Sequence, residues 1–121
     1  ASAVPAAPAP MPASVQKLSP AELAAHRAAA GSRVVVLDVR APQEFAEGHV
    51  PGAINVPHDQ VERRLGELEG YKDREVVVYC RSGRRAATAL GVLEKAGFGQ
   101  LRHLEGDMPG WTAAGQPVAK P

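Results

Sequence analysis

Residues 75–86 read EVVVYCRSGRRA, and this stretch decides the fold. The run from Glu75 to Tyr79 has the length and the β-branched content of a buried strand. A helix-forming segment then begins at Gly83 and continues to Ala96. A strand, a short loop and a helix therefore follow one another. Backbone N–H groups of such a loop, together with the positive end of the helix dipole, form a binding site for an anion.

Cys80 is the first residue of that loop and the only cysteine of the chain. Three arginines share the six-residue segment 80–85 with it. Together with the backbone N–H groups, they favour a negatively charged sulfur, which is the reactive form of a thiol. The surroundings of Cys80 therefore predict a nucleophile rather than an inert buried side chain.

Strands and helices alternate along the rest of the chain. Strands are predicted at 15–18, 33–39, 53–56, 75–79 and 101–104, and helices at 20–30, 42–46, 58–68, 83–96 and 108–114. This alternation predicts an α/β layered fold, with Asp107 as the N-cap of the last helix. Asp38 and Arg40 follow one central strand and Cys80 follows another. We expect them to converge at the carboxyl ends of the strands, where parallel sheets bind ligands.

The composition restricts the class of protein. A chain of 121 residues fits one domain, which we place at residues 15–121, after an Ala/Pro-rich leader at 1–14 that we expect to be disordered. One cysteine can form neither an internal disulfide nor a paired-thiolate zinc site. The formal net charge of +1 argues against nucleic acid binding. No apolar stretch approaches the roughly 18 residues of a membrane span, and we expect a soluble monomer.

The first residue, Ala1, is not a methionine. Removal of an export signal, removal of a tag, and excision from a longer protein each explain this start. We favour an exported, periplasmic protein, with a cytoplasmic location as the alternative.

Three motifs closely resemble those of the rhodanese family. The first signature is represented by Asp38-Val39-Arg40, Glu44-Phe45, residues 48–53 and Pro57; the active-site loop by Cys80 to Arg85; and the closing motif by residues 104–106 through Trp111. The resemblance covers about Val15 to Gly115 in the right order. Asp107 departs from the pattern, because the family often has a second glycine there. It can cap the last helix or add negative charge near the pocket.

The resemblance implies a rhodanese-like three-layer fold, with a central parallel sheet of about five strands flanked by helices. It also implies a thiosulfate sulfurtransferase. Enzymes of this family take the outer sulfur of thiosulfate, or of another persulfide donor, onto the cysteine. They then pass it to cyanide or to a thiol acceptor, such as thioredoxin or a partner protein. No metal or organic cofactor is implied.

The predicted site has one catalytic residue, Cys80. The dianionic substrate is expected to bind the rest of the loop, with Arg81 and Arg85 ahead of Arg84: Arg81, Ser82, Gly83, Arg84 and Arg85. Four further residues are predicted to support the pocket by pairing charges or anchoring a turn: Asp38, Arg40, Glu44 and His49. The remaining histidines, His26, His58 and His103, are expected at the surface or at caps. Trp111 is expected to pack the final helix.

Two other functions stay open. A sulfur-carrying or interaction module of low turnover would use the same cysteine together with a partner protein. Phosphatases and arsenate reductases also use a cysteine loop that ends in arginine, but their loops are one residue longer. Cys80 and Arg85 enclose four residues, and the tighter loop favours attack on sulfur.

Overall fold

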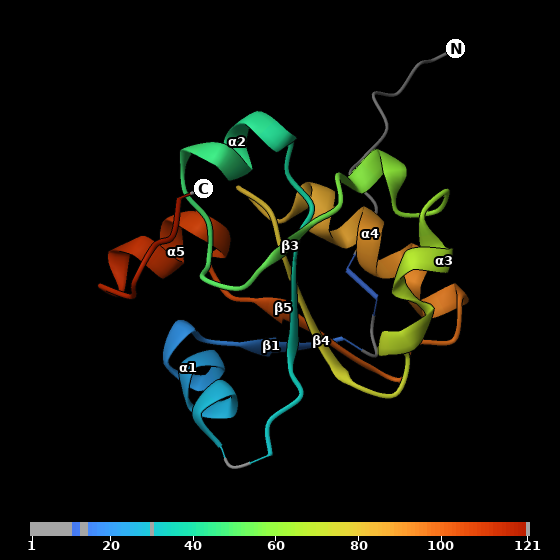
Figure 1. The fold of residues 1–121 in the computed structure, drawn as a ribbon, viewed down its shortest axis with the longest axis horizontal. Coiled ribbons are helices and arrows are strands. Elements are labelled where there is room, and N and C mark those ends of the chain that lie inside the picture. The colour runs from blue at the N-terminus through green and yellow to red at the C-terminus, as the bar shows by residue number, and fades with distance from the viewer. Residues whose placement is uncertain (1–10, 13–14, 30, 121) are drawn as a thin grey trace.

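The computed structural model describes residues 11–12, 15–29 and 31–120. Within them, five parallel strands form one sheet in the spatial order β1-β5-β4-β2-β3 (Figure 1). The strands are β1 (Gln16–Leu18), β2 (Val35–Asp38), β3 (Ile54–Asn55), β4 (Glu75–Tyr79) and β5 (Gln100–Leu104). The prediction of an α/β fold around a parallel sheet of five strands is confirmed.

Helices cover both faces of this sheet (Figure 1). On one face lie α1 (Pro20–Ala28) and α5 (Asp107–Ala113), and on the other α3 (Leu65–Leu68) and α4 (Arg84–Lys95). A further short helix, α2 (Pro42–Glu47), follows the carboxyl end of β2. Two 3-10 turns, η1 (His58–Gln60) and η2 (Glu69–Tyr71), lie before and after α3. Among the described residues, no helix is long and apolar enough to cross a membrane.

The strands divide their side chains between two layers of core, as the pleat of a sheet requires. In β4, Val76 and Val78 belong to the cluster that contains α4, whereas Val77 and Tyr79 belong to the cluster that contains Trp111 of α5. These four side chains are at most 1% exposed. Because β4 is paired on both edges and covered on both faces, the residue that follows it is held firmly in place.

The predicted helix at 58–68 is wrong. The structure has η1, a run of turns and the short α3 in its place. The backbone of Arg64 leaves the helical region (φ −106°, ψ 16°), and Gly66 lowers the local helix propensity. Val61 and Leu68 are nevertheless fully buried. Packing onto the core therefore needs this apolar spacing without needing a continuous helix.

The predicted leader, residues 1–14, lies mostly outside the described residues. Of its members, Met11 and Pro12 are described. Met11 is partly buried and packs against the core cluster that contains α4, and the carbonyl of Pro12 accepts the N–H of Val15 at 3.1 Å. Met11 and Pro12 therefore contact the folded part of the chain.

Candidate active site

Cys80 follows β4 directly and begins the loop that leads into α4. Its side chain has no exposed surface. The backbone N of Gly83 lies 2.9 Å from the Cys80 Sγ and donates its N–H to the sulfur. Gly83 has φ +93°, a left-handed conformation that glycine adopts without a steric penalty. The loop thus folds back so that its own backbone binds the sulfur of its first residue.

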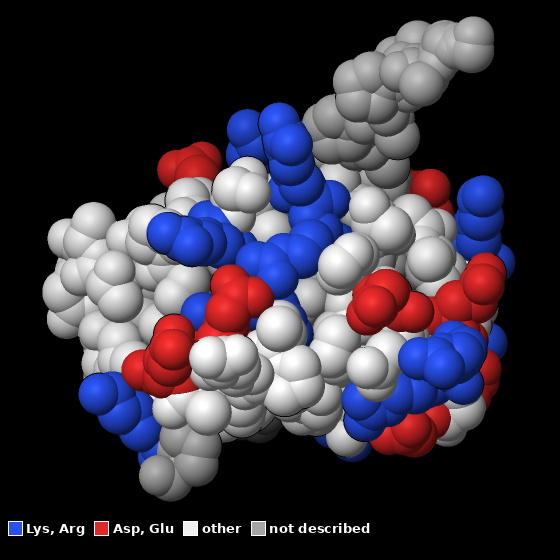
Figure 2. All heavy atoms as spheres, turned by 90° about the horizontal axis from the view of Figure 1, so that it is seen from above, with Lys and Arg blue, Asp and Glu red and all other residues white. Residues whose placement is uncertain are grey.

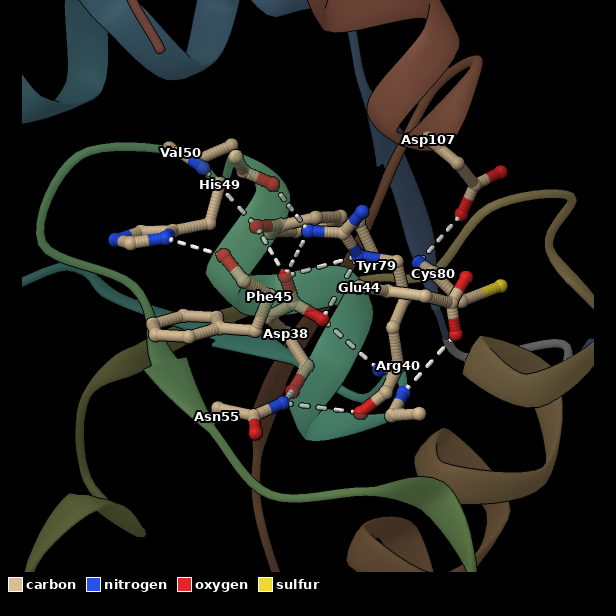
Figure 3. A network of polar contacts seen from close by, with 12 residues as sticks. Asp38, Arg40, Glu44, Phe45, His49, Val50, Asn55, Tyr79, Cys80 and Asp107 are labelled. Atoms are coloured by element: carbon tan, nitrogen blue, oxygen red, sulfur yellow. Dashed lines mark hydrogen bonds and ion pairs between the residues drawn. The ribbon is translucent and has the colours of Figure 1, made fainter. Parts of the chain in front are cut away.

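The start of α5 holds the peptide units on both sides of Cys80. The backbone N of Cys80 donates to Asp107 Oδ1 at 3.0 Å, and the Cys80 carbonyl accepts the N–H of Met108 at 3.0 Å. Figure 3 shows the Asp107 carboxylate directed at the backbone N of Cys80. We call Asp107 and Met108 the α5 clamp. Because Asp107 already accepts the Cys80 N–H, this group is not free to bind an anion in the loop.

The prediction that Asp107 is the N-cap of the last helix is wrong. Gly106 occupies that position, without a side-chain hydrogen bond, and Asp107 is the first helical residue. Asp107 has φ +54°, a left-handed conformation that is uncommon outside glycine but enriched in Asp. Its side chain is turned inward and is 6% exposed. The carboxylate therefore binds inside the protein instead of capping the helix.

The expectation that His103 is a surface or capping residue is also wrong. His103 is only 7% exposed, because it shares the buried side of β5 with Leu101, on the face of the sheet that α4 covers. Its Nε2 lies 2.9 Å from Asp107 Oδ1. A carboxylate can only accept, so Nε2 is the donor. Nδ1 of His103 is buried and has no hydrogen-bond partner among the described residues.

The other two histidines expected at the surface are partly exposed. His26 pairs with Glu75, with 2.8 Å between Nδ1 and Oε1. His58 is the first residue of η1.

The loop arginines lie in different surroundings. Arg85 forms a two-point ion pair with Glu44, with Nη1–Oε1 and Nη2–Oε2 distances of 2.6 Å and 3.0 Å. Arg81 and Arg84 are exposed, as is Ser82, and Arg81 lines an open pocket beside the loop. Of the two arginines that the sequence ranks first for substrate, Arg81 is exposed at the pocket, whereas Arg85 is bound to a carboxylate.

The pair of Arg85 and Glu44 affects the charges around the sulfur. The hydrogen bonds from Arg85 lower the pKa of Glu44 from its ordinary 4.5 to about 2. The same bonds raise the pKa of Arg85, and the nearby Cys80 adds to this increase. Both side chains are therefore charged at neutral pH. The positive charge of Arg85 acts on Cys80 even though its N–H groups point to Glu44.

Asp38 and Arg40 form a buried ion pair next to the loop. Arg40 Nη2 lies 2.6 Å from Asp38 Oδ2 and also donates to the carbonyl of Gly48 at 2.7 Å. The Tyr79 hydroxyl donates to Asp38 Oδ2 at 2.7 Å and accepts the N–H of Val50 at 3.1 Å. Burial is the main cause that raises the pKa of Tyr79, and the negative charge of Asp38 raises it further. Figure 3 shows these groups converging on Asp38 and joining the ends of β2 and β4.

His49 anchors the turn that follows α2. Its Nδ1 lies 2.9 Å from the carbonyl of Phe45, and the two rings stack with 3.7 Å between their centroids. Its backbone forms an antiparallel bridge with Ala119, with N–O distances of 2.9 Å and 2.8 Å. These contacts fix the turn and attach the C-terminal segment to it.

The candidate site lies at the carboxyl ends of β2 and β4, as predicted, because these strands are parallel neighbours. Figure 2 views this side of the molecule and shows Lys and Arg atoms gathered in the middle of the face, with acidic atoms beside them. A net charge of +1 is thus compatible with a locally basic surface. In the part of the chain that the structure describes, no group of three or more His, Cys, Asp or Glu side chains could hold a metal ion.

Some contacts of the site were not predicted from the sequence. The amide of Asn55 donates to the carbonyls of Asp38 and Arg40, at 3.0 Å each, and Tyr79 links Asp38 to Val50. A tyrosine at the end of an otherwise aliphatic strand is a usable signal, since a buried hydroxyl needs a partner. The link between Asp107 and Cys80 joins residues far apart in sequence and has no local signal.

Comparison with known proteins identifies the family. The Rhodanese-like domain family matches residues 19–114. The chain belongs to this family. A sulfurtransferase of Allochromatium vinosum is 38% identical to this rhodanese-like domain over 88 residues, which are 73% of the chain and 80% of that protein. The crystal structure of a thiosulfate sulfurtransferase from Pseudomonas aeruginosa has a TM-score of 0.77 at 29% identity, covering 88% of this chain and 20% of that one.

Rhodanese-like domains also occur in longer relatives. An HTH-type transcriptional regulator of Mycobacterium tuberculosis is 40% identical over 100 residues, which are 81% of this chain and 42% of that protein. The chain thus spans most of one relative and less than half of another. The family and the sulfurtransferase type of the rhodanese domain are established by these matches, and the resemblance seen in the sequence motifs is confirmed.

Proposed function

We propose that this rhodanese-like domain moves the sulfane sulfur of thiosulfate, or of another persulfide donor, through a Cys80 persulfide to cyanide or a thiol acceptor. The observation that carries the proposal is the 2.9 Å contact between the Gly83 N–H and the Cys80 Sγ. A backbone donor aimed at sulfur stabilises negative charge there, both before and after sulfur transfer. The loop of four residues between Cys80 and Arg85 favours a sulfur electrophile over a phosphate ester.

The reaction has two steps. In the first, the Cys80 thiolate attacks the outer sulfur of thiosulfate; a new S–S bond forms, and sulfite leaves with the electron pair of the old one. In the second, cyanide or a thiolate attacks the outer sulfur of the persulfide. The Cys80 thiolate then leaves with the bonding pair and is regenerated. This order predicts ping-pong kinetics.

Entry of the donor requires a change in the loop. Cys80 has no exposed surface, so the segment 80–85 must shift before an outer sulfur can reach Sγ. The exposed Arg81 and Arg84 lie on this segment and attract a dianion to it. We therefore assign Arg81 and Arg84 two successive roles. They first bind the dianionic donor and then stabilise the negative charge that moves during S–S cleavage.

Mass spectrometry of the protein after thiosulfate treatment tests the proposal. We expect one added sulfur on Cys80 and an equal amount of released sulfite. Cys80→Ser should abolish both, because a serine hydroxyl stays protonated at neutral pH, while circular dichroism shows the fold unchanged. Sulfite release by Cys80→Ser at the wild-type rate would exclude the mechanism.

A sulfur carrier of low turnover is the second candidate, and the complete burial of Cys80 favours it. In this function the persulfide would be delivered to a partner protein rather than to a small acceptor. A purified protein that carries a persulfide, yet releases sulfite from thiosulfate only slowly, would establish the carrier. Turnover of a phosphate ester but not of thiosulfate would instead assign phosphatase chemistry to the loop.

A further inference from the structure

We propose that Asp107 and His103 are positioning residues, which hold the backbone of Cys80 and make the reactivity of its sulfur depend on the charge of a buried pair. The consequence of this arrangement for sulfur transfer rests on the proposed function. The effect on the reactivity of the Cys80 sulfur does not, because it can be measured without a sulfur donor.

The first support is the position of the pair. Asp107 Oδ1 accepts both the Cys80 N–H, at 3.0 Å, and the His103 Nε2–H, at 2.9 Å. The pair also lies under Gly83, the residue that donates to Sγ. A Cβ atom built on Gly83 would lie 3.4 Å from Asp107 Oδ2 and 3.6 Å from His103 Cε1. Asp107 thus binds one end of the backbone segment that surrounds the sulfur, and both side chains lie close to its other end.

The second support is the charge of the pair. The carboxylate of Asp107, whose side chain is 6% exposed, lies against the backbone of Cys80, where it opposes negative charge on the same residue's sulfur. A proton on His103 would compensate this charge. Other charged groups nearby include Lys17, which is next to His103 in the register of β1 and β5, and Arg85, which acts on Cys80 and is itself paired with Glu44.

The third support is the backbone of Asp107. A non-glycine residue with φ +54° carries conformational strain, and such strain persists where the surrounding contacts hold the residue in place. A glycine would adopt this φ freely but would supply no carboxylate. The side chain of Asp107 thus adds an acceptor and a charge at a position where the backbone alone would favour glycine.

The test is the pH profile of Cys80 alkylation by iodoacetamide, which needs no sulfur donor. Asp107→Asn keeps an oxygen acceptor in a residue that tolerates positive φ, but it removes the charge. Asp107→Gly removes both, and His103→Gln keeps a donor that cannot titrate. Glu105→Gln is the matched control, because it removes an exposed carboxylate from the same turn. Thermal melts of all four variants identify any loss of fold.

We expect Asp107→Asn to move the alkylation profile to lower pH, as the loss of a nearby like charge requires. In Asp107→Gly the same shift should come with a lower maximal rate, because the Cys80 N–H loses its acceptor. His103→Gln should change the alkylation rate, because Asp107 then loses a partner that is able to carry a positive charge. Glu105→Gln should match the wild type.

Wild-type profiles in both Asp107→Asn and His103→Gln would overturn the inference. If the variants shift the pH profile of Cys80 alkylation but the protein forms no persulfide with thiosulfate, the role of Asp107 and His103 is supported. The same result refutes thiosulfate as the sulfur donor. The two proposals can therefore fail separately.

Discussion

At the scale of single residues, the sulfur of Cys80 lies between contacts of opposite electrostatic effect. The Gly83 N–H and the charge of Arg85 stabilise negative charge on sulfur. The Asp107 carboxylate, bound to the backbone N–H of the same cysteine, opposes it. A thiol in this position has its reactivity set by the difference between these effects, and single substitutions should change it in either direction.

The ion pair of Glu44 and Arg85 makes stability depend on pH. The pKa of Glu44 falls from 4.5 to about 2 on folding, so the pair stabilises the fold fully above pH 4.5 and loses this contribution as the pH falls toward 2. We expect Glu44→Gln to lower the melting temperature at neutral pH. The difference from the wild type should shrink across that acidic range.

Thermal melts between pH 2 and pH 7 measure this dependence, a range that includes the titration of Glu44. Glu47→Gln, which removes an exposed carboxylate from the same helix, is the control and should show little effect at any pH. A constant difference between Glu44→Gln and the wild type down to the lowest pH would contradict the assignment.

Arg81 is expected to contribute to donor binding. Loss of a charge-assisted contact of about 1.5–3 kcal/mol predicts that Arg81→Gln raises the KM for thiosulfate about ten- to a hundredfold, since each 1.4 kcal/mol is about a factor of ten. The KM for a neutral thiol acceptor should change much less. Steady-state kinetics with both substrates varied measures the two constants.

The control for Arg81 is Arg33→Gln, which removes an exposed arginine near the amino end of β2. It should leave both KM values unchanged. Equal increases for the donor and the neutral acceptor in Arg81→Gln would show that the arginine has a structural role only.

At the scale of elements, the ends of β2 and β4 are joined by side chains as well as by the sheet. The Tyr79 hydroxyl connects Asp38 of β2 to the backbone of Val50, on the turn that leads to β3. Arg40 extends this connection to the carbonyl of Gly48. The network fixes the relative position of the two loops between which the candidate site lies.

Removal of the Tyr79 hydroxyl tests this network. Tyr79→Phe would leave the buried N–H of Val50 without its acceptor, and such a group costs about 1–3 kcal/mol. We expect urea denaturation to show a loss of that size with an unchanged m-value. Tyr71→Phe, on a partly exposed tyrosine, should have a much smaller effect, and similar losses in the two variants would argue against the network.

The sequence predicts the elements unequally well, and the reasons are physical. The apolar strands and the capping box of Ser19 and Glu22 come from local patterns in the sequence, and the structure contains both. The segment 58–68 has the apolar spacing of a helix, but packing onto the core determines that it forms short helical turns instead of one continuous helix. The same limit applies to the site, because Cys80 and its loop are contiguous, whereas Asp107 and His103 reach them only through the fold.

At the scale of the whole molecule, the sheet separates two apolar layers, and α4 covers the larger one (Figure 1). Leu90 of α4 is completely buried. We expect Leu90→Ala to destabilise the protein by about 2–5 kcal/mol, the cost of a cavity in a packed core. Because α4 begins at the active-site loop, Cys80 should become accessible in the same denaturation transition.

Urea unfolding followed by circular dichroism and by Cys80 alkylation measures both effects. Thr88→Ala, at an exposed position of the same helix, is the control and should change stability by less than about 0.5 kcal/mol. Exposure of Cys80 well before the loss of helix signal would show that the loop unfolds separately from the core.

The α5 clamp has one practical consequence. Trp111 is the only tryptophan of the chain, and it lies in α5, about one turn beyond Asp107 and Met108. Trp111 is 2% exposed, and its indole N–H donates to the carbonyl of Pro117 at 2.7 Å. A movement of α5 away from Cys80 that also opens the core around Trp111 would change the hydration of this ring. The unlabelled protein therefore carries a fluorescent reporter of its own, which can follow such a movement of α5 in real time.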